Sequence, residues 1–231
     1  MSDPVNTQWL ELAPGFAGHL ALPPAGRGPG LVLFQEIFGV NPHIRAVAEA
    51  YALDGFVVLA PDLFWRQAPR VQLGYEGADR QQALALMQAY TAQDALFDVA
   101  TSVAVLRARP EVTGKVGALG YCMGGRMAYL AAATTDVNAA VPFYGGGIHT
   151  QLDRARDITC PTQFHYAEHD DHIPLSAVDQ VRQALAGQPA ELHLYPGAHH
   201  GFNCWARASY HAESAALSHG RALAFLAQHL F

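Results

Sequence analysis

A thiol flanked by closely spaced glycines stands out in residues 120–125, Gly-Tyr-Cys-Met-Gly-Gly. The segment follows the apolar run Val116 to Leu119 and leads into an Ala-rich helix predicted over Met127 to Ala133. Gly-x-Cys-x-Gly has the form of a nucleophile elbow in which Cys replaces Ser. At a helix N-terminus, the dipole and the free backbone N–H groups lower a thiol pKa and can hold an oxyanion. The alternative is that Cys122 is a small buried residue in a glycine-rich turn.

An acid and a histidine follow two other predicted strands. Asp170 comes shortly after the run Thr162 to Tyr166, and His200 shortly after Glu191 to Tyr195. Cys, Asp, His is the chain order of the α/β-hydrolase triad, in which the acid orients the histidine and the histidine acts as base. Taken alone, either residue could be an ordinary turn or capping residue. The three segments together favour a catalytic triad.

Glu36 is a fourth candidate. It follows the apolar run Leu31 to Phe34 and precedes Ile37 and Phe38. A carboxyl group in such an apolar pocket has a raised pKa and could accept the thiol proton. The alternative is a surface acid that caps the following helix.

Short apolar runs separated by helical patterns must position these residues. A hairpin is predicted over Thr7 to Leu12 and Phe16 to Pro23, and buried strands over Leu31–Phe34, Val57–Ala60, Val116–Leu119, Ala139–Phe143, Thr162–Tyr166 and Glu191–Tyr195. Three helix faces are predicted between or after them: Ile44, Val47, Ala48 and Tyr51; Leu96, Val99, Val103 and Leu106; and Leu217, Leu223, Phe225 and Leu226. Continuous apolar runs suit parallel strands covered on both faces. The alternation predicts an α/β fold with a mostly parallel, doubly wound sheet flanked by helices and a site at the carboxyl ends of its strands.

Composition favours one globular domain that binds small molecules. The chain has 231 residues, 51% of them hydrophobic, and a formal net charge of −6, which disfavours nucleic acid as a partner. We expect a single domain over residues 1–231. Residues 1–4 lack the basic region of a signal peptide, and no apolar stretch is long enough for a membrane span, so a cytoplasmic protein without membrane contact is expected. The cysteines 122, 160 and 204 form no Cys-x-x-Cys pair and are predicted to be free thiols.

Five motifs resemble those of a known family. They are residues 35–41 (Gln-Glu-Ile-Phe-Gly-Val-Asn), 60–64 (Ala-Pro-Asp-Leu-Phe), 120–125, 170–174 (Asp-Asp-His-Ile-Pro) and 198–202 (Ala-His-His-Gly-Phe). Together they resemble the dienelactone hydrolases, or carboxymethylenebutenolidases, which are cysteine-dependent enzymes of the α/β-hydrolase fold. The resemblance extends from about Leu31 to Phe231.

The resemblance implies roles for individual residues. Cys122 would be the nucleophile and Glu36 would control formation of its thiolate. The motif positions select Asp170 over Asp171 as the acid, and His200 over His199 as the base. The resemblance further implies that the backbone N–H groups of Ile37 and Met123 form the oxyanion hole.

Residues that would contact substrate follow the family pattern only in part. Arg80 matches an arginine that binds the substrate carboxylate, and Tyr144 matches a pocket tyrosine; a solvated arginine and a core aromatic are the alternatives. Leu84 and Met87 stand where the family has aromatic residues. Cys204 stands where the family has a second arginine, and Arg207, three positions further, is the candidate replacement. These departures leave the triad intact and place the family's own substrate in question.

The expected activity is hydrolysis of a lactone or ester through an acyl-thiol intermediate, with no cofactor and no metal. Opening of a dienelactone to a maleylacetate-type product, as in the degradation of aromatic compounds, is what the resemblance implies. Three alternatives stay open. They are a broad-specificity carboxylesterase, a metal-dependent hydrolase that uses the cluster His165, His169 and His172, and a non-catalytic binding protein of the same fold.

Overall fold

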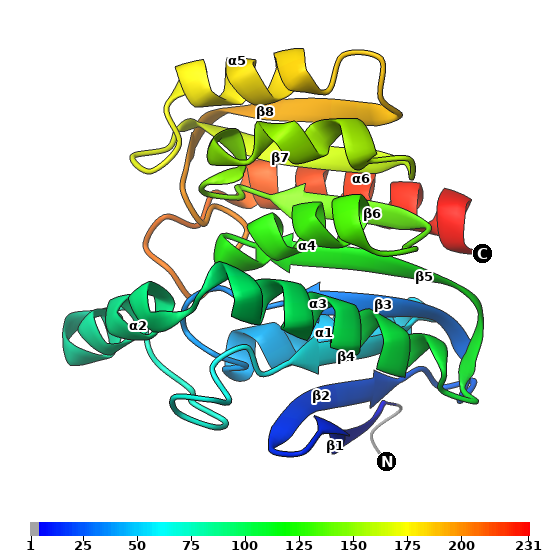
Figure 1. The fold of residues 1–231 in the computed structure, drawn as a ribbon. Helices are drawn as coiled ribbons and strands as arrows, with labels where there is room; N and C mark the ends of the chain where they lie inside the picture. Colours follow the sequence, from blue (N-terminus) through cyan, green and yellow to red (C-terminus); the bar gives the residue numbers. More distant parts are fainter. Residues whose placement is uncertain (1–4) are drawn as a thin grey trace.

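A computed structural model describes residues 5–231 and contains one eight-stranded sheet (Figure 1). The strands are β1 (Asn6–Ala13), β2 (Phe16–Leu22), β3 (Gly28–Phe34), β4 (Val57–Pro61), β5 (Val112–Tyr121), β6 (Ala139–Phe143), β7 (Thr162–His169) and β8 (Ala190–His199). Their spatial order is β1-β2-β4-β3-β5-β6-β7-β8. The hairpin β1–β2 is antiparallel and joins β4 in antiparallel register, whereas β4, β3, β5, β6, β7 and β8 pair in parallel. The predicted α/β architecture is therefore confirmed.

Helices cover both faces of this sheet. They are α1 (Pro42–Leu53), α2 (Gly77–Ala89), α3 (Ala92–Arg107), α4 (Met123–Thr134), α5 (Leu175–Ala184) and α6 (Ala212–Leu230), with the short 3-10 helices η1 (Ile148–Thr150) and η2 (Leu152–Asp157). Figure 1 shows α3, α4 and α5 on one face and α1 and α6 on the other. Strands β3, β4 and β6 are buried along their whole length, as expected for central parallel strands. No helix formed by residues 5–231 combines the length and apolar character that a membrane span requires. Residues 1–4, to which the signal-peptide expectation refers, lie outside the described part of the chain.

The C-terminal helix packs through a face that overlaps only in part with the one predicted. Of the four predicted residues only Leu226 is buried, and Leu217 is 48% exposed. The buried residues of α6 are Ser214, Ala215, Ser218, Ala222, Leu226 and Leu230. Small side chains at four of these positions let the helix lie close to the sheet, while Leu223 and Phe225 are half-buried against the core. The predicted faces of α1 and α3 are correct, except that Leu96 is only half-buried.

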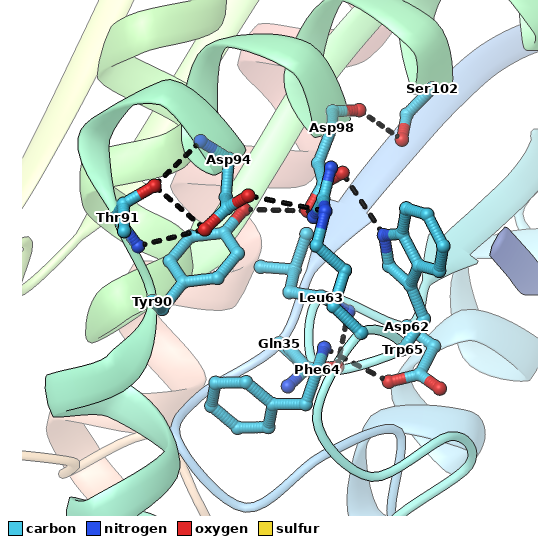
Figure 2. Close-up of polar contacts among 11 residues, drawn as sticks. Gln35, Asp62, Leu63, Phe64, Trp65, Tyr90, Thr91, Asp94, Asp98 and Ser102 are labelled. Carbon is cyan, nitrogen blue, oxygen red and sulfur yellow. Dashed lines mark hydrogen bonds and ion pairs between the residues drawn. The ribbon is translucent and has the colours of Figure 1, made fainter.

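Helix α2 projects from the body of the molecule (Figure 1) and buries only Ala83 and Leu86. Its C-terminal end is held by a buried polar cluster around Asp98 (Figure 2). This carboxylate accepts hydrogen bonds from Tyr90 Oη at 2.9 Å, Trp65 Nε1 at 3.2 Å and Arg66 Nη1 at 3.0 Å. Tyr90 is the residue at which α2 ends, so the cluster fixes the junction between α2 and α3.

Candidate active site

The predicted chemical residues meet at the carboxyl ends of the parallel strands. Cys122 follows β5, Asp170 follows β7 and His200 follows β8. Cys122 and His200 border a cavity of about 300 Å³, and Asp170 lies behind His200. Its lining residues are Ile37, Phe38, Arg80, Leu84, Met87, Cys122, Met123, Arg126, Gly146, Gly147, His172, His200 and Arg207.

Cys122 has a strained backbone that its neighbours enforce. Its φ is 57° and its ψ −115°, a conformation that is unfavourable for a residue with a side chain. A Cβ at Gly120 would lie 2.1 Å from the carbonyl oxygen of Gly124, and one at Gly124 would lie 2.2 Å from that of Phe34. Glycine at both positions therefore lets the chain turn sharply between β5 and α4, which presents Cys122 at the N-terminus of α4.

Asp170 and His200 form a direct pair. His200 Nδ1 lies 2.7 Å from Asp170 Oδ2, and both side chains are buried. The other oxygen, Oδ1, accepts the backbone N–H groups of His172 at 2.8 Å and Ile173 at 3.1 Å. Three contacts thus fix the orientation of the carboxylate, which in turn fixes the imidazole.

The neighbouring acid and histidine face elsewhere. Asp171 and His199 are exposed, and the ring of His199 lies 5.7 Å from that of the exposed His169. The positions that the family pattern selects are thus the pair that the fold buries together.

Cys122 and His200 interact electrostatically. Burial opposes a charged imidazolium, but a Cys122 thiolate and the hydrogen-bonded Asp170 carboxylate outweigh it and raise the pKa of His200 to about 10. His200 is therefore placed to hold a proton beside Cys122 near neutral pH. The edge of Tyr144, 5.1 Å from His200 between ring centroids, packs against this imidazole.

Two backbone N–H groups are free to bind an oxyanion. Ile37 and Met123 border the cavity, and neither N–H group donates to an acceptor within residues 5–231. Met123 is the first residue of α4, where a helix leaves its N–H groups unpaired. Donors of this kind stabilise the charge that develops on a carbonyl oxygen under attack.

Glu36 is buried beside the triad and ion-pairs with Arg207. It is 2% exposed, and Arg207 Nη1 donates to its Oε1 at 2.9 Å. Burial raises the pKa of Glu36, whereas the charges of Arg207 and His200 act in the opposite direction. Cys204, at the position of the family's second arginine, is fully buried, and its Sγ lies 3.4 Å from Tyr75 Oη. Arg207 rather than Cys204 therefore reaches the cavity.

Helix α2 supplies one wall of the cavity. Arg80, Leu84 and Met87 lie on this helix and line the cavity as a group. Tyr144 is buried behind His200 and does not line it. Phe38 and Arg126 also line the cavity and were not among the predicted substrate-binding residues. Arg126 follows Cys122 by four positions, a spacing that places two residues on the same side of a helix and could have indicated it.

The three histidines of the alternative metal site do not converge. His165 is fully buried, and both its ring nitrogens are engaged, Nδ1 with Tyr195 Oη at 2.7 Å and Nε2 with Gln163 Oε1 at 2.9 Å. His172 lines the cavity, whereas His169 is exposed. Within residues 5–231 no group of three or more His, Cys, Asp and Glu side chains is placed to hold a metal ion. The arrangement of the described residues therefore contradicts the alternative of a metal site built on these three histidines.

Comparison with known sequences supports the resemblance drawn from the motifs. Residues 16–230 match the model of the family described as "Dienelactone hydrolase family". A carboxymethylenebutenolidase of a Pseudomonas species is 37% identical over 186 residues, which cover 80% of this chain and 78% of the relative. The carboxymethylenebutenolidase of Pseudomonas putida is 34% identical over 214 residues, which cover 92% of this chain and 91% of the relative.

Comparison with solved structures agrees. A crystal structure of a candidate dienelactone hydrolase from Klebsiella pneumoniae superposes with a TM-score of 0.85 at 32% identity and covers 97% of this chain and 99% of that one. A dienelactone hydrolase from Anabaena variabilis, at 18% identity, has a TM-score of 0.72 over 99% of this chain and all of its own, and it shares the fold.

Proposed function

Because the chain belongs to the dienelactone hydrolase family, it is a hydrolase of ester or lactone bonds, and we propose that Cys122 is its nucleophile. The proposed substrate is a small lactone or ester that carries a carboxylate, with dienelactone as the reference compound. A non-catalytic protein of the same fold, one of the alternatives above, is excluded by this family membership.

In the proposed first step, the Cys122 thiolate attacks the substrate carbonyl carbon. The carbonyl oxygen becomes an oxyanion and accepts hydrogen bonds from the N–H groups of Ile37 and Met123. Collapse of this intermediate breaks the C–O bond, forms a thioester and releases the ring oxygen as an enolate or alkoxide. The protonated His200 donates its proton to that leaving group.

In the second step, water releases the acid. His200, now neutral, takes a proton from water, and the resulting hydroxide attacks the thioester carbon. The C–S bond breaks, the thiolate re-forms and the imidazolium is restored. Asp170 holds the imidazole in position and stabilises its positive charge throughout. Glu36, ion-paired with Arg207, is the proposed residue that controls formation of the Cys122 thiolate before substrate binds.

The geometry of the nucleophile carries this proposal. Cys122 occupies a strained turn at a helix N-terminus, and its electrostatic partner His200 is hydrogen-bonded to a buried carboxylate. A cysteine in a purely structural role would need neither the strain nor a buried ion pair, both of which reduce stability.

Hydrolysis assays with a nucleophile variant test the proposal. Native protein and Cys122→Ala would be assayed with cis- and trans-dienelactone and with p-nitrophenyl acetate, with and without chelator. Rapid opening of dienelactone by native protein, loss of activity in the variant and indifference to chelator are expected. Full activity in Cys122→Ala would refute the proposed nucleophile. Cys160→Ala, which changes a buried thiol outside the cavity, is the matched control.

A broad-specificity carboxylesterase is the second candidate, and the wall supplied by α2 favours it. Leu84 and Met87 line the cavity where the resemblance implies aromatic residues, so this wall fits flexible acyl chains as well as planar rings. Turnover of p-nitrophenyl acetate without turnover of either dienelactone would support this candidate and keep the same chemistry.

A further inference from the structure

Among residues 5–231, three arginines and no carboxylate line the catalytic cavity. Arg207 is ion-paired with Glu36, which lies behind the cavity wall. The guanidinium groups of Arg80 and Arg126 have no hydrogen-bond or ion-pair partner within residues 5–231. The cavity therefore offers two positive charges that the protein itself leaves without a counter-ion.

Arg126 occupies a position at which a cation is intrinsically unfavourable. It lies in the first turn of α4, close to the positive end of the helix dipole. The neighbouring chain leaves room for its side chain, because Gly147 has a φ of 83° and a Cβ there would lie 3.1 Å from Arg126 Nη1. Gly146 and Gly147 line the cavity beside it. The guanidinium of Arg126 thus lies at the cavity wall although the dipole of α4 disfavours a positive charge there.

A second cavity, of about 120 Å³, adjoins Arg126 on the side of α3. Its lining includes Arg154 from η2 and the polar residues Thr91 and Gln151, and it contains no acidic residue. Arg154 is half-buried and has no ion-pair partner among residues 5–231. Two unpaired guanidinium groups on one small cavity repel each other unless an anion lies between them.

Arg80 and Arg207 lie toward a different depression. Both line a surface depression with Tyr75, Glu76 and Ala206, and this depression shares no lining residue with the cavity beside Arg154. The catalytic cavity thus shares Arg80 and Arg207 with this depression and Arg126 with the cavity beside Arg154, so that its arginines face two separate neighbouring hollows.

We propose that Arg126 and Arg154 form a second anion subsite, so that the preferred substrates are esters or lactones with two carboxylates, one on each side of the scissile bond. This inference rests on the proposed function of Cys122. One carboxylate would bind at Arg80 and Arg207, and the other at Arg126 and Arg154, where the planar guanidinium groups can each donate two parallel hydrogen bonds. An otherwise similar mono-acid would leave one pair of guanidinium groups without a partner.

Four matched esters test the proposal. They are phenyl butyrate, which is neutral; phenyl hemiglutarate, with a carboxylate on the acyl chain; 4-carboxyphenyl butyrate, with one on the leaving group; and 4-carboxyphenyl hemiglutarate, with both. The kcat/KM of each is divided by that of phenyl butyrate. The doubly charged ester should have the highest ratio. Charge-assisted hydrogen bonds of this kind are each expected to contribute about tenfold or more.

Variants assign each carboxylate to its subsite. Arg126→Gln should lower the ratio at least about tenfold for one of the two singly charged esters, and Arg80→Gln for the other. Arg126→Lys should restore part of the ratio because it keeps the charge. Arg156→Gln, an exposed arginine on η2 that lines none of these cavities, is the control and should leave every ratio unchanged.

Two outcomes would overturn the subsite. One is a doubly charged ester that is no better than the better singly charged ester. The other is that Arg126→Gln and Arg80→Gln lower the ratio for the same singly charged ester, since this would mean one anion site. Failure of the proposed function gives a different result, because the neutral ester phenyl butyrate tests it without the ratios. If Cys122→Ala still hydrolyses phenyl butyrate, Cys122 is not the nucleophile, whatever the ratios are. Calorimetric binding of the doubly charged ester to Cys122→Ala, compared with binding to Cys122→Ala/Arg126→Gln, measures the subsite without turnover.

Discussion

Arg207 Nη1 donates to Glu36 Oε1 at 2.9 Å and so joins two residues 171 positions apart in the chain. Glu36 lies on the loop after β3, and Arg207 lies on the connection from β8 to α6, which also carries His200. The ion pair therefore links the loop that carries one proposed oxyanion donor, Ile37, to the connection that carries the proposed base, His200. Its removal should affect both stability and catalysis.

Arg207→Gln should destabilise the protein more at alkaline than at acidic pH. Burial already raises the pKa of Glu36, and loss of the guanidinium should raise it further. A carboxyl group whose folded-state pKa lies above its unfolded value destabilises the fold when ionised, and this penalty disappears as pH falls through the folded-state pKa. We expect a loss of about 3 kcal/mol at about pH 8 and a smaller loss at about pH 5, measured by urea unfolding. Equal losses at both pH values would contradict this account, and Glu36→Gln/Arg207→Gln should recover part of the stability.

Asp170→Asn should abolish most activity while the adjacent Asp171→Asn should not. The amide cannot accept the His200 Nδ1 proton in the same way and favours the wrong tautomer, so kcat/KM should fall about 10³- to 10⁴-fold. Asp171 is exposed and makes no contact with His200 that would transmit such a change. The measurement is kcat/KM for p-nitrophenyl acetate in both variants. Similar activities in the two would show that Asp170 does not orient the base.

Alkylation should select one of the three thiols. Cys122 is half-buried, lines the cavity and lies beside a protonated His200. Burial raises the pKa of Cys160, and it raises that of Cys204 to about 11. Iodoacetamide near neutral pH should therefore modify Cys122 first. Activity should be lost at the same rate as Cys122 is labelled, and peptide mass spectrometry measures the labelling. Predominant early labelling at Cys160 or Cys204 would be inconsistent with this environment.

Asp98→Ala should weaken substrate binding from a distance. Asp98 is fully buried and accepts from Trp65, Arg66 and Tyr90, so its removal leaves three donors without this acceptor and should cost about 3 kcal/mol. Because Tyr90 ends α2, the wall formed by this helix should become less ordered, and KM should rise more than kcat falls (Figure 2).

Asp94→Ala is the comparison for that variant. It removes the capping box at the start of α3 and a half-exposed ion pair with Arg66 but keeps the Asp98 carboxylate, and it should cost only about 1 kcal/mol, with little change in KM. If Asp98→Ala changed kcat and left KM unaltered, the cluster would not be acting through α2.

The sheet could be predicted from the sequence because each central strand is apolar throughout, and β3, β4 and β6 prove to be buried at every residue. The packing face of α6 could not be predicted in full from the sequence. It consists mainly of alanine and serine, whose burial depends on how closely the helix approaches its neighbours. Leu217, the most hydrophobic choice at the start of that helix, is exposed.

The same distinction applies to the site. Cys122, Asp170 and His200 were predictable because each directly follows a strand, and the carboxyl ends of parallel strands converge. The ion pair between Arg207 and Glu36 was not predictable, because no local sequence pattern connects Arg207 to a carboxylate on another loop. Arg126, like Arg80 and Arg154, has no ion-pair partner among residues 5–231, and this is a property of its surroundings in three dimensions.

The weak attachment of α2 separates substrate choice from folding. Of its 13 residues only Ala83 and Leu86 are buried, yet Arg80, Leu84 and Met87 together form one wall of the cavity. Substitutions at these three positions should therefore be tolerated by the fold and still reshape the cavity. A combinatorial library over positions 80, 84 and 87 should therefore change which acids and esters the protein accepts. It should do so without lowering the stability that the strained turn at Cys122 requires. Helix α2 is in this sense the most evolvable part of the enzyme.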